Sequence, residues 1–228
     1  DSDASILLCE VDNPSRFGIA DIKDGKITKI MEKPKDPPTN LAVTGIYFLT
    51  SKIFDVISRL KPSWRNELEI TDALQMLLEE GNKITHNTIT DYWKDTGTPE
   101  DIINANKEIL DNMKPYFLGT KEEDVEINGN VMVEEGTKIK SGSKLFGPLI
   151  IGKNCIIENN SRIGPNTSIG ENTIISNSDI KDSIIMNNCH VNSTRKIRKS
   201  IISTNSKINE TQSDEKILLL GEGTTIQI

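Results

Sequence analysis

The 228-residue sequence lacks a cysteine framework, a long apolar run and a signal-peptide pattern. Its three cysteines, Cys9, Cys155 and Cys189, have no metal-ligand spacing, and an odd count without a framework indicates reduced cytoplasmic thiols. No apolar run approaches the roughly 20 residues that a membrane span needs. The chain also does not open on the charged and apolar regions of a secretory signal. These absences predict a cytoplasmic protein with no membrane partner.

Basic excess is also lacking. Lys and Arg number 27 against 34 Asp and Glu, which gives a net charge of −7 and argues against a nucleic-acid partner held by general phosphate attraction. The one basic run, residues 195–199, either binds an anion or forms a solvated face, and the acidic chain favours the second reading. The two histidines, His86 and His190, are expected to be structural.

The sequence does contain a regular six-residue repeat. Apolar residues recur at every sixth position at Ile127, Val133, Ile139, Leu145, Ile151, Ile157, Ile163, Ile169 and Ile175. Small or β-branched residues stand four positions after most of them, at Val131, Thr137, Ser143, Cys155, Ser161, Thr167 and Thr173. Neither a helix nor an alternating strand has this period. The pattern predicts a hexapeptide-repeat β-helix in which short strands and turns stack on one another, with about three regular coils.

Beyond Ile175 the six-residue step breaks. The next apolar positions are Ile185, Val191, Ile197, Ile202 and Ile208. We interpret the extra residues 179–183 as a loop pushed out of a coil. Residues 216–220 and 225–228, separated by a Gly-Glu-Gly turn, are predicted to form a closing hairpin that covers the open end of the stack.

The first half of the chain alternates strand and helix patterns, which is typical of an α/β layered domain. Predicted strands cover residues 6–11, 17–22, 26–32, 42–49 and 83–89, and predicted helices cover 51–60, 71–80 and 99–113. Asp24-Gly25 is the hairpin signal between the second and third strands. The polar linker 119–124 predicts two domains, residues 1–118 and 119–228.

Three candidate sites follow from the residues alone, each with a structural alternative. Glu32 and Lys33 are adjacent on a strand and point to opposite faces, unless Pro34 ends the strand and lets both turn into one pocket. Asp95 lies before a glycine turn and is either an Asx-turn residue or a ligand of a hard cation. Arg65 is either a phosphate partner or an ordinary surface arginine.

Five segments occur together in a fixed order. They are Phe17-Gly18, residues 31–34 (Met-Glu-Lys-Pro), residues 42–48 (Ala-Val-Thr-Gly-Ile-Tyr-Phe), residues 66–72 (Asn-Glu-Leu-Glu-Ile-Thr-Asp) and residues 93–97 (Trp-Lys-Asp-Thr-Gly). In this order they resemble the second half of the sugar-1-phosphate nucleotidylyltransferases. The sequence is most similar to the long-form glucose-1-phosphate thymidylyltransferase family, which carries an appended left-handed β-helix.

The resemblance implies a partial Rossmann-like nucleotidyltransferase domain, of α/β class, followed by a left-handed parallel β-helix. It implies transfer of a nucleotidyl group from dTTP or UTP to glucose-1-phosphate with release of pyrophosphate, Mg²⁺ as cofactor and a homo-oligomer. Lys33 and Arg65 would grip the sugar phosphate as catalytic residues, and Asp95 would be one of two aspartates on Mg²⁺. The remaining substrate-binding residues would be Gly18, Glu32, Val43, Thr44, Gly45 and Trp93.

Several family features do not occur in the sequence. The glycine-rich nucleotide loop (Gly-x-Gly-Thr-Arg), the base-reading segment and the first metal aspartate precede the first strand in the family and have no counterpart here. Arg65 is followed by Asn66 where the family has glycine. We therefore expect this chain to be an inactive fragment with the sugar half of the site, and its full-length parent to be the enzyme.

Two other functions agree with a hexapeptide repeat. A hexapeptide-repeat acyltransferase would need a long array and a histidine base, and here about three regular coils and His190 are available. An assembly or regulatory module, in which the repeat acts as an oligomerisation prism, is the reading that we favour for the C-terminal half alone.

Overall fold

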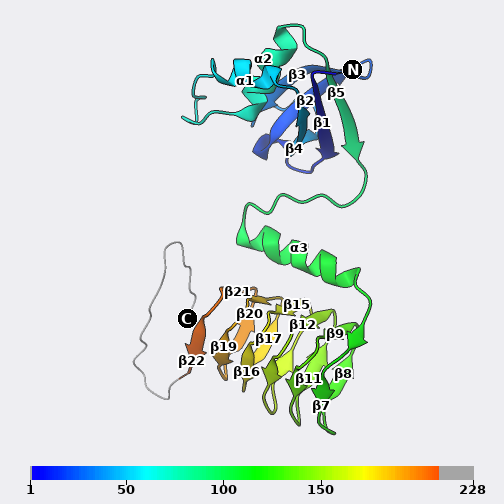
Figure 1. Cartoon of the computed structure of the whole chain (residues 1–228), viewed down its shortest axis with the longest axis vertical. Coiled ribbons are helices and arrows are strands. Elements are labelled where there is room, and N and C mark those ends of the chain that lie inside the picture. The colour runs from blue at the N-terminus through cyan, green and yellow to red at the C-terminus, as the bar shows by residue number, and fades with distance from the viewer. Residues whose placement is uncertain (1, 211–228) are drawn as a thin grey trace. The chain divides into compact units, whose positions relative to one another are not determined.

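The computed structural model describes residues 2–210, and it divides the chain into two compact units, Asp1–Asp95 and Thr96–Ile228 (Figure 1). The predicted domain boundary at residue 118 lies later, after the helix α3 (Pro99–Asp111). The compact units divide before α3 because this helix packs on the second unit, as described below. The boundary drawn from the sequence motifs stays a prediction.

The first unit contains a five-stranded sheet with the strand order β3-β2-β4-β1-β5. The strands are β1 (Ala4–Glu10), β2 (Gly18–Lys23), β3 (Lys26–Glu32), β4 (Leu41–Leu49) and β5 (Ile84–Ile89), and a 3-10 turn, η1 (Pro14–Arg16), precedes β2. Only the β1–β5 pair is parallel. Asp24 and Gly25 both have positive φ, 50° and 71°, between β2 and β3, which confirms the predicted hairpin.

Helices α1 (Lys52–Ile57) and α2 (Ile70–Glu79) complete this unit (Figure 1). α2 packs on β3, and α1 packs on α2. Their buried residues join the sheet in a core of Ala4, Ile6, Leu8, Ala20, Ile27, Ile30, Val43, Ile53, Val56, Ala73, Leu74, Leu77 and Ile84. The apolar residues of the helix predicted over 51–60 lie largely on one face, at Ile53, Phe54, Val56, Ile57 and Leu60, but the buried part of that face is narrower. Phe54 is 69% exposed, because so short a helix buries only Ile53 and Val56.

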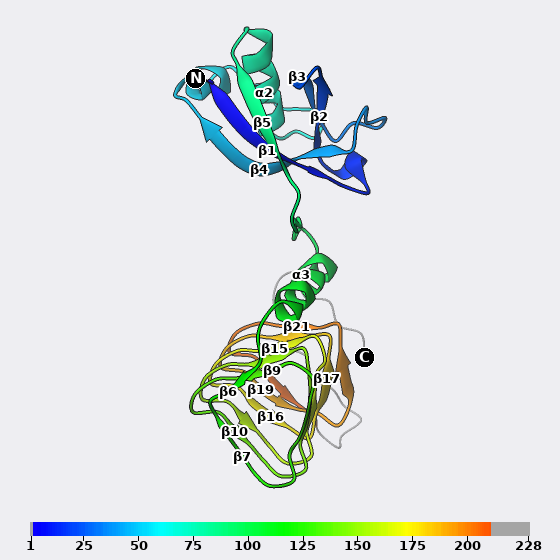
Figure 2. The same ribbon diagram turned by 90° about the vertical axis from the view of Figure 1, so that its right-hand side faces the viewer.

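The second unit is a parallel β-solenoid with three sheets, consistent with a left-handed β-helix (Figure 2). Each solenoid strand pairs in parallel with the strand three places later in the chain, so that β7 pairs with β10 and β10 with β13. Within residues 2–210 the three sheets hold six, five and six strands. The strands are β6 (Tyr116–Phe117), β7 (Thr120–Lys121), β8 (Glu126–Asn128), β9 (Val131–Val133), β10 (Lys138–Ile139), β11 (Lys144–Phe146), β12 (Leu149–Ile151), β13 (Ile156–Ile157), β14 (Arg162–Ile163), β15 (Thr167–Ile169), β16 (Ile174–Ser176), β17 (Asp179–Lys181), β18 (Ile184–Ile185), β19 (His190–Asn192), β20 (Lys196–Arg198), β21 (Ile201–Ile202) and β22 (Lys207–Asn209).

The predicted six-residue pattern forms the solenoid core. All its apolar positions from Val133 to Ile175 are buried, and only Ile127 is partly open, at 36%, because β8 is the edge strand of its sheet. The small polar positions are buried too. The hydroxyls of Thr137, Ser143, Thr167 and Thr173 bond to the backbone, whereas Ser161 Oγ has no partner among the described residues. For example, Thr137 Oγ1 donates to the Gly152 carbonyl at 2.6 Å and accepts from Cys155 N at 2.9 Å. Each coil is therefore fastened to the next by side chains as well as by the sheets.

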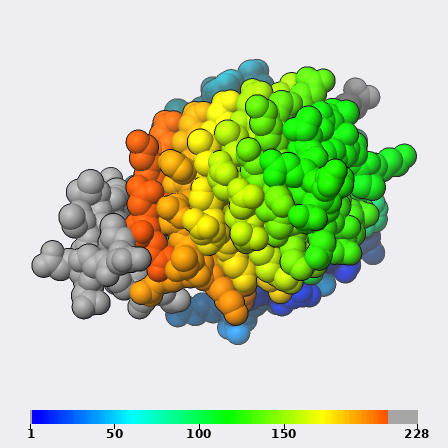
Figure 3. Space-filling view, turned by 90° about the horizontal axis from the view of Figure 1, so that it is seen from below, coloured from blue at the N-terminus to red at the C-terminus, as the bar shows by residue number. Residues whose placement is uncertain are grey.

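Asparagines form many of the solenoid corners. Asn154, Asn160, Asn166, Asn172 and Asn188 all have φ between 54° and 57°, a left-handed conformation that asparagine tolerates better than most residues. Some of them also bond to the next coil through their side chains, since Asn172 Nδ2 donates to Asn188 Oδ1 at 3.2 Å. The successive coils appear as parallel bands on the surface in Figure 3.

The prediction for residues 179–183 was wrong. Asp179–Lys181 is strand β17, and Ile180 pairs with both Ile163 and Ile197 in the ladder. The period changes because a corner loses one residue, so that Ile175, Ile180 and Ile185 stand five residues apart. The solenoid is thus longer than the three coils on which the case against acyl transfer partly rested.

The helix α3 belongs to the second unit. The residues Thr98-Pro99-Glu100-Asp101 predict a capping box, and Thr98 does cap the helix, since its Oγ1 accepts from Asp101 N at 3.2 Å. Asn106 holds the helix on β15, where its Oδ1 accepts from Ser168 Oγ. The sequence predicts a buried stripe at Ile102, Ile103, Ile109, Leu110 and Met113, which is only partly correct, because Leu110 is buried but Ile109 is 60% exposed. Among the described residues, no helix has both the length and the apolarity that crossing a bilayer requires. The predicted closing hairpin lies outside the described residues.

Candidate functional site

The site begins where β3 ends, at Glu32. The next residue, Lys33, has a positive φ of 40°, and its backbone N–H donates to the Phe17 carbonyl at 3.0 Å. This change of direction interrupts the strand alternation, so that Lys33 Nζ lies 3.9 Å from Glu32 Oε1. The structure therefore realises the second of the two alternatives for this pair, in which both side chains turn to one side ahead of Pro34.

The Glu32 carboxylate is held by two other elements. Thr71 Oγ1, in the first turn of α2, donates to Glu32 Oε2 at 2.8 Å. Gly18, in β2, lies directly opposite Glu32 in the hairpin. A Cβ at Gly18 would come within 2.5 Å of Thr71 Cγ2 and 3.1 Å of Glu32 Oε2. Only glycine leaves room for this arrangement, so the backbone at Gly18 stays close to the carboxylate.

Arg65 lies in the loop before α2, surrounded by carboxylates. Its guanidinium is 2.9 Å from Glu67 Oε2, 3.2 Å from Glu69 Oε1 and 3.6 Å from Glu32 Oε1. Ser63 Oγ donates to the same oxygen of Glu69 at 2.9 Å. Arg65 is thus placed next to Glu32 by a network of charges, and it is not one of the described residues that line the cleft.

A β-bulge in β4 forms the opposite wall. Ile6 pairs with Tyr47 and Leu8 with Val43, so the single residue between them in β1 faces three in β4. Thr44 Oγ1 donates to the Leu7 carbonyl at 2.9 Å. Gly45 has a φ of 81°, and no described atom lies within 4 Å of where its Cβ would be. A glycine inside a strand suggests close approach of a ligand or of another backbone. Within the described protein, the conformation of Gly45, not crowding, requires glycine.

These elements enclose a cleft of about 310 Å³ within the first unit. Its lining residues are Arg16, Phe17, Gly18, Glu32, Lys33, Val43, Thr44, Gly45, Tyr47, Glu69, Ile70, Thr71, Trp93 and Asp95. Every predicted site residue except Arg65 is among them. Trp93 is positioned by an edge-to-face contact with Phe17, with the ring centroids 5.8 Å apart.

The sequence interpretation missed several lining residues. Thr71 was interpreted only as the start of a helix, although it lies in one of the quoted segments, and Tyr47 was interpreted only as part of a strand. Both lie near carboxylates. The pKa of the Tyr47 hydroxyl is raised by burial and then by the charge of Glu32. The pKa of the Asp72 carboxyl is raised by burial and then by Glu69. Both shifts show that partial burial and a neighbouring carboxylate act together at these two positions.

A metal ion would find only part of its ligands here. Within residues 2–210 no group of three or more His, Cys, Asp or Glu side chains is arranged to hold a metal. Asp95 does line the cleft, with Lys33 in the same lining. Mg²⁺ is commonly held by one or two carboxylates together with substrate phosphates, and a single exposed aspartate facing a cleft fits that mode.

A second cavity, of about 420 Å³, adjoins the cleft through the shared pair Glu32 and Lys33. The rest of its lining comes from Pro34, Lys35 and Trp64. Trp64 is 81% exposed, which is unusual for so large an apolar side chain.

In the basic run of the second unit, Arg195, Lys196 and Lys199 are exposed, while Arg198 is partly buried and paired. Arg198 pairs with Asp179 of the preceding coil, Nη2 to Oδ1 at 2.8 Å, and Nη1 donates to the Asp179 carbonyl at 2.7 Å. This contact ties two coils together, in agreement with the interpretation of these residues as a face of the repeat.

Comparison with known proteins gives two family matches. A model described as "Nucleotidyl transferase" matches residues 1–112, and one described as "GMPPB C-terminal domain" matches residues 145–228.

Individual relatives agree with these matches. The chain is 48% identical over 136 residues to the low-salt glycan biosynthesis nucleotidyltransferase Agl11 of Haloferax volcanii, which covers 59% of this chain and 38% of the relative. It is 33% identical over 196 residues to a glucose-1-phosphate thymidylyltransferase of Streptomyces griseus, and this match covers 86% of this chain and 55% of the relative. A crystal structure of a Bacillus anthracis protein described as a glucose-1-phosphate thymidylyltransferase matches at 44% identity, covering 50% of this chain and 46% of that chain, with a TM-score of 0.44. The chain thus spans between about two fifths and about half the length of these relatives.

Proposed function

The chain belongs to the sugar-1-phosphate nucleotidyltransferase family, and from this premise we propose that its cleft is the sugar-phosphate side of a nucleotidyltransferase active site. The proposed reaction transfers a nucleotidyl group from dTTP or UTP to glucose-1-phosphate and releases pyrophosphate. The observation that carries the proposal is the meeting of Glu32, Lys33 and Gly18 with Thr44-Gly45, Trp93 and Asp95 around one cleft.

Sugar hydroxyls would be recognised by Glu32 and by the nearby backbone. A carboxylate can accept several hydrogen bonds, and Thr71 occupies only Oε2. The absence of a side chain at Gly18 lets Thr71 and Glu32 pack against the β2 backbone, so a ligand bound to the carboxylate would also lie beside that backbone. The indole of Trp93 supplies an apolar surface for the C–H face of the ring. Together these groups would select a polyhydroxylated ring and fix its orientation.

The sugar phosphate would be bound by Lys33 and Arg65. Lys33 Nζ lies at the edge of the cleft, beside Glu32. Arg65 would bind a phosphate oxygen in place of the Glu67 carboxylate, which is the most exposed of its three partners. Lysine and arginine suit this role because the reaction brings two polyanions together, and cations positioned in advance reduce their repulsion in the transition state.

Asp95 would supply one oxygen ligand to Mg²⁺ carried with the phosphates. When bound, the ion would neutralise phosphate charge. The residues of this chain bind and orient the sugar phosphate, and Lys33 keeps a positive charge at the oxygen that attacks.

For the solenoid we propose an assembly role. Its core is filled by side chains, and its outer surface presents short parallel strands on three faces, which suit packing against further copies in a homo-oligomer. Sedimentation of the chain at several concentrations would test this, and a monomer at all of them would contradict it.

Calorimetric titration with glucose-1-phosphate tests the proposed site. We expect binding by the chain, and at least tenfold weaker binding by Glu32→Gln and Lys33→Ala, a loss of about 1.4 kcal/mol each. Lys29→Ala is the matched control, because Lys29 is an exposed lysine of the same strand, β3, outside the cleft. Absence of binding, or equal binding by all variants, would contradict the proposal.

A further inference from the structure

A row of charged side chains lies on the outer face of one solenoid sheet, the sheet β20-β17-β14-β11-β8. In each of its strands the residue before the buried core position points outward, because side chains alternate along a strand. The register places these residues side by side on successive coils, in the order Glu126, Lys144, Arg162, Asp179 and Lys196. Asp179 is partly buried and the other four are exposed. We call this set the charged row.

The charges of this row are only partly paired within the chain. Lys144 Nζ lies 2.7 Å from Glu126 Oε1, and Arg198 Nη2 lies 2.8 Å from Asp179 Oδ1. The Arg162 guanidinium lies over the Phe146 ring, 4.1 Å from its centroid. Within residues 2–210, neither Arg162 nor Lys196 forms an ion pair. Exposed positive charge in the row is thus left for an acidic group of another molecule.

A second copy of the row, turned by a two-fold axis that runs along β14, supplies such acidic groups. When two copies pack face to face about this axis, the order of the strands is reversed, so that β8 faces β20 and β11 faces β17 of the second copy. Glu126 then faces Lys196 of the second copy, and Lys144 faces Asp179. Each of these contacts occurs twice, as an isologous interface requires. The row is therefore complementary in charge to its own reverse.

The other two sheets do not have this property. The helix α3 packs on β15 and occupies the outer face of the sheet to which that strand belongs (Figure 2). On the sheet β22-β19-β16-β13-β10-β7 the corresponding outward row is Thr120, Lys138, Ile156, Ile174, His190 and Lys207. Reversing that row places Lys138 opposite His190 and brings no acidic residue opposite a basic one. Charge complementarity thus selects a single face.

We propose that two copies of this chain pair through the charged row, with their solenoid axes antiparallel. The inference rests on the assembly role proposed above for the solenoid, and it names the face and the symmetry of that assembly. Arg162 makes the one like-charged contact of the row, because β14 lies on the axis and faces its own copy. Like charges that meet across an interface oppose association, so Arg162 sets a limit to the affinity.

Sedimentation equilibrium of the full 228-residue chain measures the dissociation constant of the dimer. Glu126→Lys and Lys196→Glu each convert two opposite-charge contacts into like-charge contacts, so each should weaken the dimer roughly tenfold. The double variant Glu126→Lys, Lys196→Glu exchanges the two charges and should recover most of the affinity. Arg162→Gln should strengthen the dimer, since it removes the repulsion at the axis.

Lys138→Glu is the matched control, because it reverses the charge of an exposed lysine on the neighbouring sheet and should leave the dissociation constant unchanged. Glu126→Lys also loses the pair with Lys144 inside the chain. Lys196→Glu breaks no ion pair within the described residues, so its effect reports on association alone.

The outcomes separate this inference from the proposals on which it rests. The charged row is overturned if the double variant stays as weak as the single ones, if the single variants associate as the unmodified chain does, or if the oligomer is a trimer. In each of these cases the assembly role stands. A monomer at every concentration overturns the assembly role and the charged row together. Titration with glucose-1-phosphate tests the cleft in any case.

Discussion

Thr71 donates a hydrogen bond to Glu32 at 2.8 Å, and its methyl group fills the space that a side chain at Gly18 would need. Three elements, β2, β3 and α2, meet in this contact. The hydroxyl orients the carboxylate, while the methyl group packs against the β2 backbone at Gly18 and requires glycine there. One threonine thus supports the two features by which the cleft would recognise a sugar.

Gly18→Ala should damage both stability and binding. The new methyl group would lie 2.5 Å from Thr71 Cγ2, and overpacking of this kind costs about 1–3 kcal/mol. Urea unfolding and glucose-1-phosphate titration measure the two effects. The double variant Gly18→Ala, Thr71→Ser removes the clashing methyl group but keeps the hydroxyl, so it should recover most of both losses. A double variant as impaired as Gly18→Ala would show that the clash is not the cause.

Glu67→Gln should strengthen binding of glucose-1-phosphate. It removes a carboxylate 2.9 Å from the Arg65 guanidinium, an exposed pair whose loss frees the arginine for roughly a two- to fivefold gain in affinity. Arg65→Lys should weaken binding, since lysine cannot reproduce the planar fork. Glu80→Gln is the matched control, because it breaks another exposed pair, 2.6 Å from Arg59, away from the cleft. Unchanged or weaker binding by Glu67→Gln would contradict an exchange of partners.

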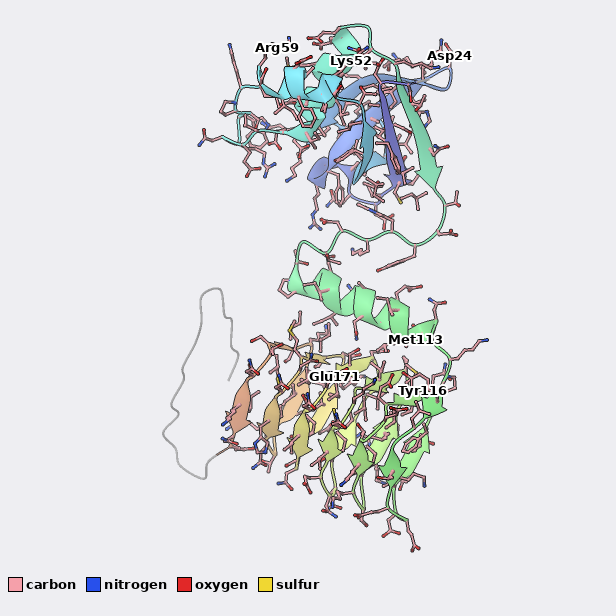
Figure 4. The ribbon with its side chains drawn as sticks, viewed as in Figure 1. Asp24, Lys52, Arg59, Met113, Tyr116 and Glu171 are labelled. Atoms are coloured by element: carbon pink, nitrogen blue, oxygen red, sulfur yellow. The ribbon has the colours of Figure 1, made fainter. Side chains whose placement is uncertain are left out.

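Loss of the Tyr116 hydroxyl proton should make the solenoid less stable at high pH. Tyr116, labelled in Figure 4, follows α3 at the start of the solenoid. Its hydroxyl donates to Glu134 Oε1 at 2.6 Å, and this bond, together with burial, raises the pKa of Tyr116 to about 12. The folded state therefore holds this proton more tightly than the unfolded state, whose tyrosine titrates near 10. The contribution is complete below about pH 10 and is lost as the pH rises through 12.

Unfolding measured at several pH values checks this. Tyr116→Phe should remove the part of the decline between pH 10 and 12 that this residue causes, and ultraviolet absorbance should show one tyrosine fewer titrating late. A decline of the same size in Tyr116→Phe would rule out this bond as its source.

Ile157→Ala should loosen the middle of the solenoid. Ile157 is fully buried in β13, and truncating such a side chain costs about 2–5 kcal/mol. Its neighbour Ile156, only partly buried in the same strand, is the control, and Ile156→Ala should cost less. Hydrogen exchange of peptides covering residues 150–175 reports on this unit alone, which matters because two units need not unfold together. Equal protection in both variants would contradict the assignment of the two faces.

The regular part of the solenoid could be predicted because one buried apolar residue recurs at every sixth position. From Val133 to Ile175 each apolar side chain fills one layer of the core, so the sequence repeats as the structure does. The later coils could not be predicted by the same count. Ile180 was overlooked because it follows Ile175 after five residues, whereas a fixed step of six from Ile175 gives Lys181.

The site residues were recognised from their local segments, but their connections were not. Glu32 and Lys33 stood out in the sequence, whereas the φ of Lys33 that brings them to one side depends on a bond to Phe17. Arg65 was interpreted as either a phosphate partner or a surface arginine. Glu67 and Glu69 stand in its own segment, but the sequence does not show that Glu32, from the preceding hairpin, joins them around its guanidinium. Lys35 and Trp64 attracted no interpretation, since they are far apart in sequence and meet only through folding.

The shortened corners have a consequence for how such a gene can change. The corners at Asn177 and Asp182 are one residue shorter than the corner at Asn160, and the residue that they lack stands just before the left-handed position. The buried serine after that position is present in all three corners, as Ser161, Ser178 and Ser183. A single codon can therefore be deleted at that point without exchanging inner and outer side chains. The same deletion inside a strand would turn every following isoleucine of that rung outward. Single-codon deletion scanning should accordingly show tolerated sites in a ring along the corners, with intolerant stretches between them.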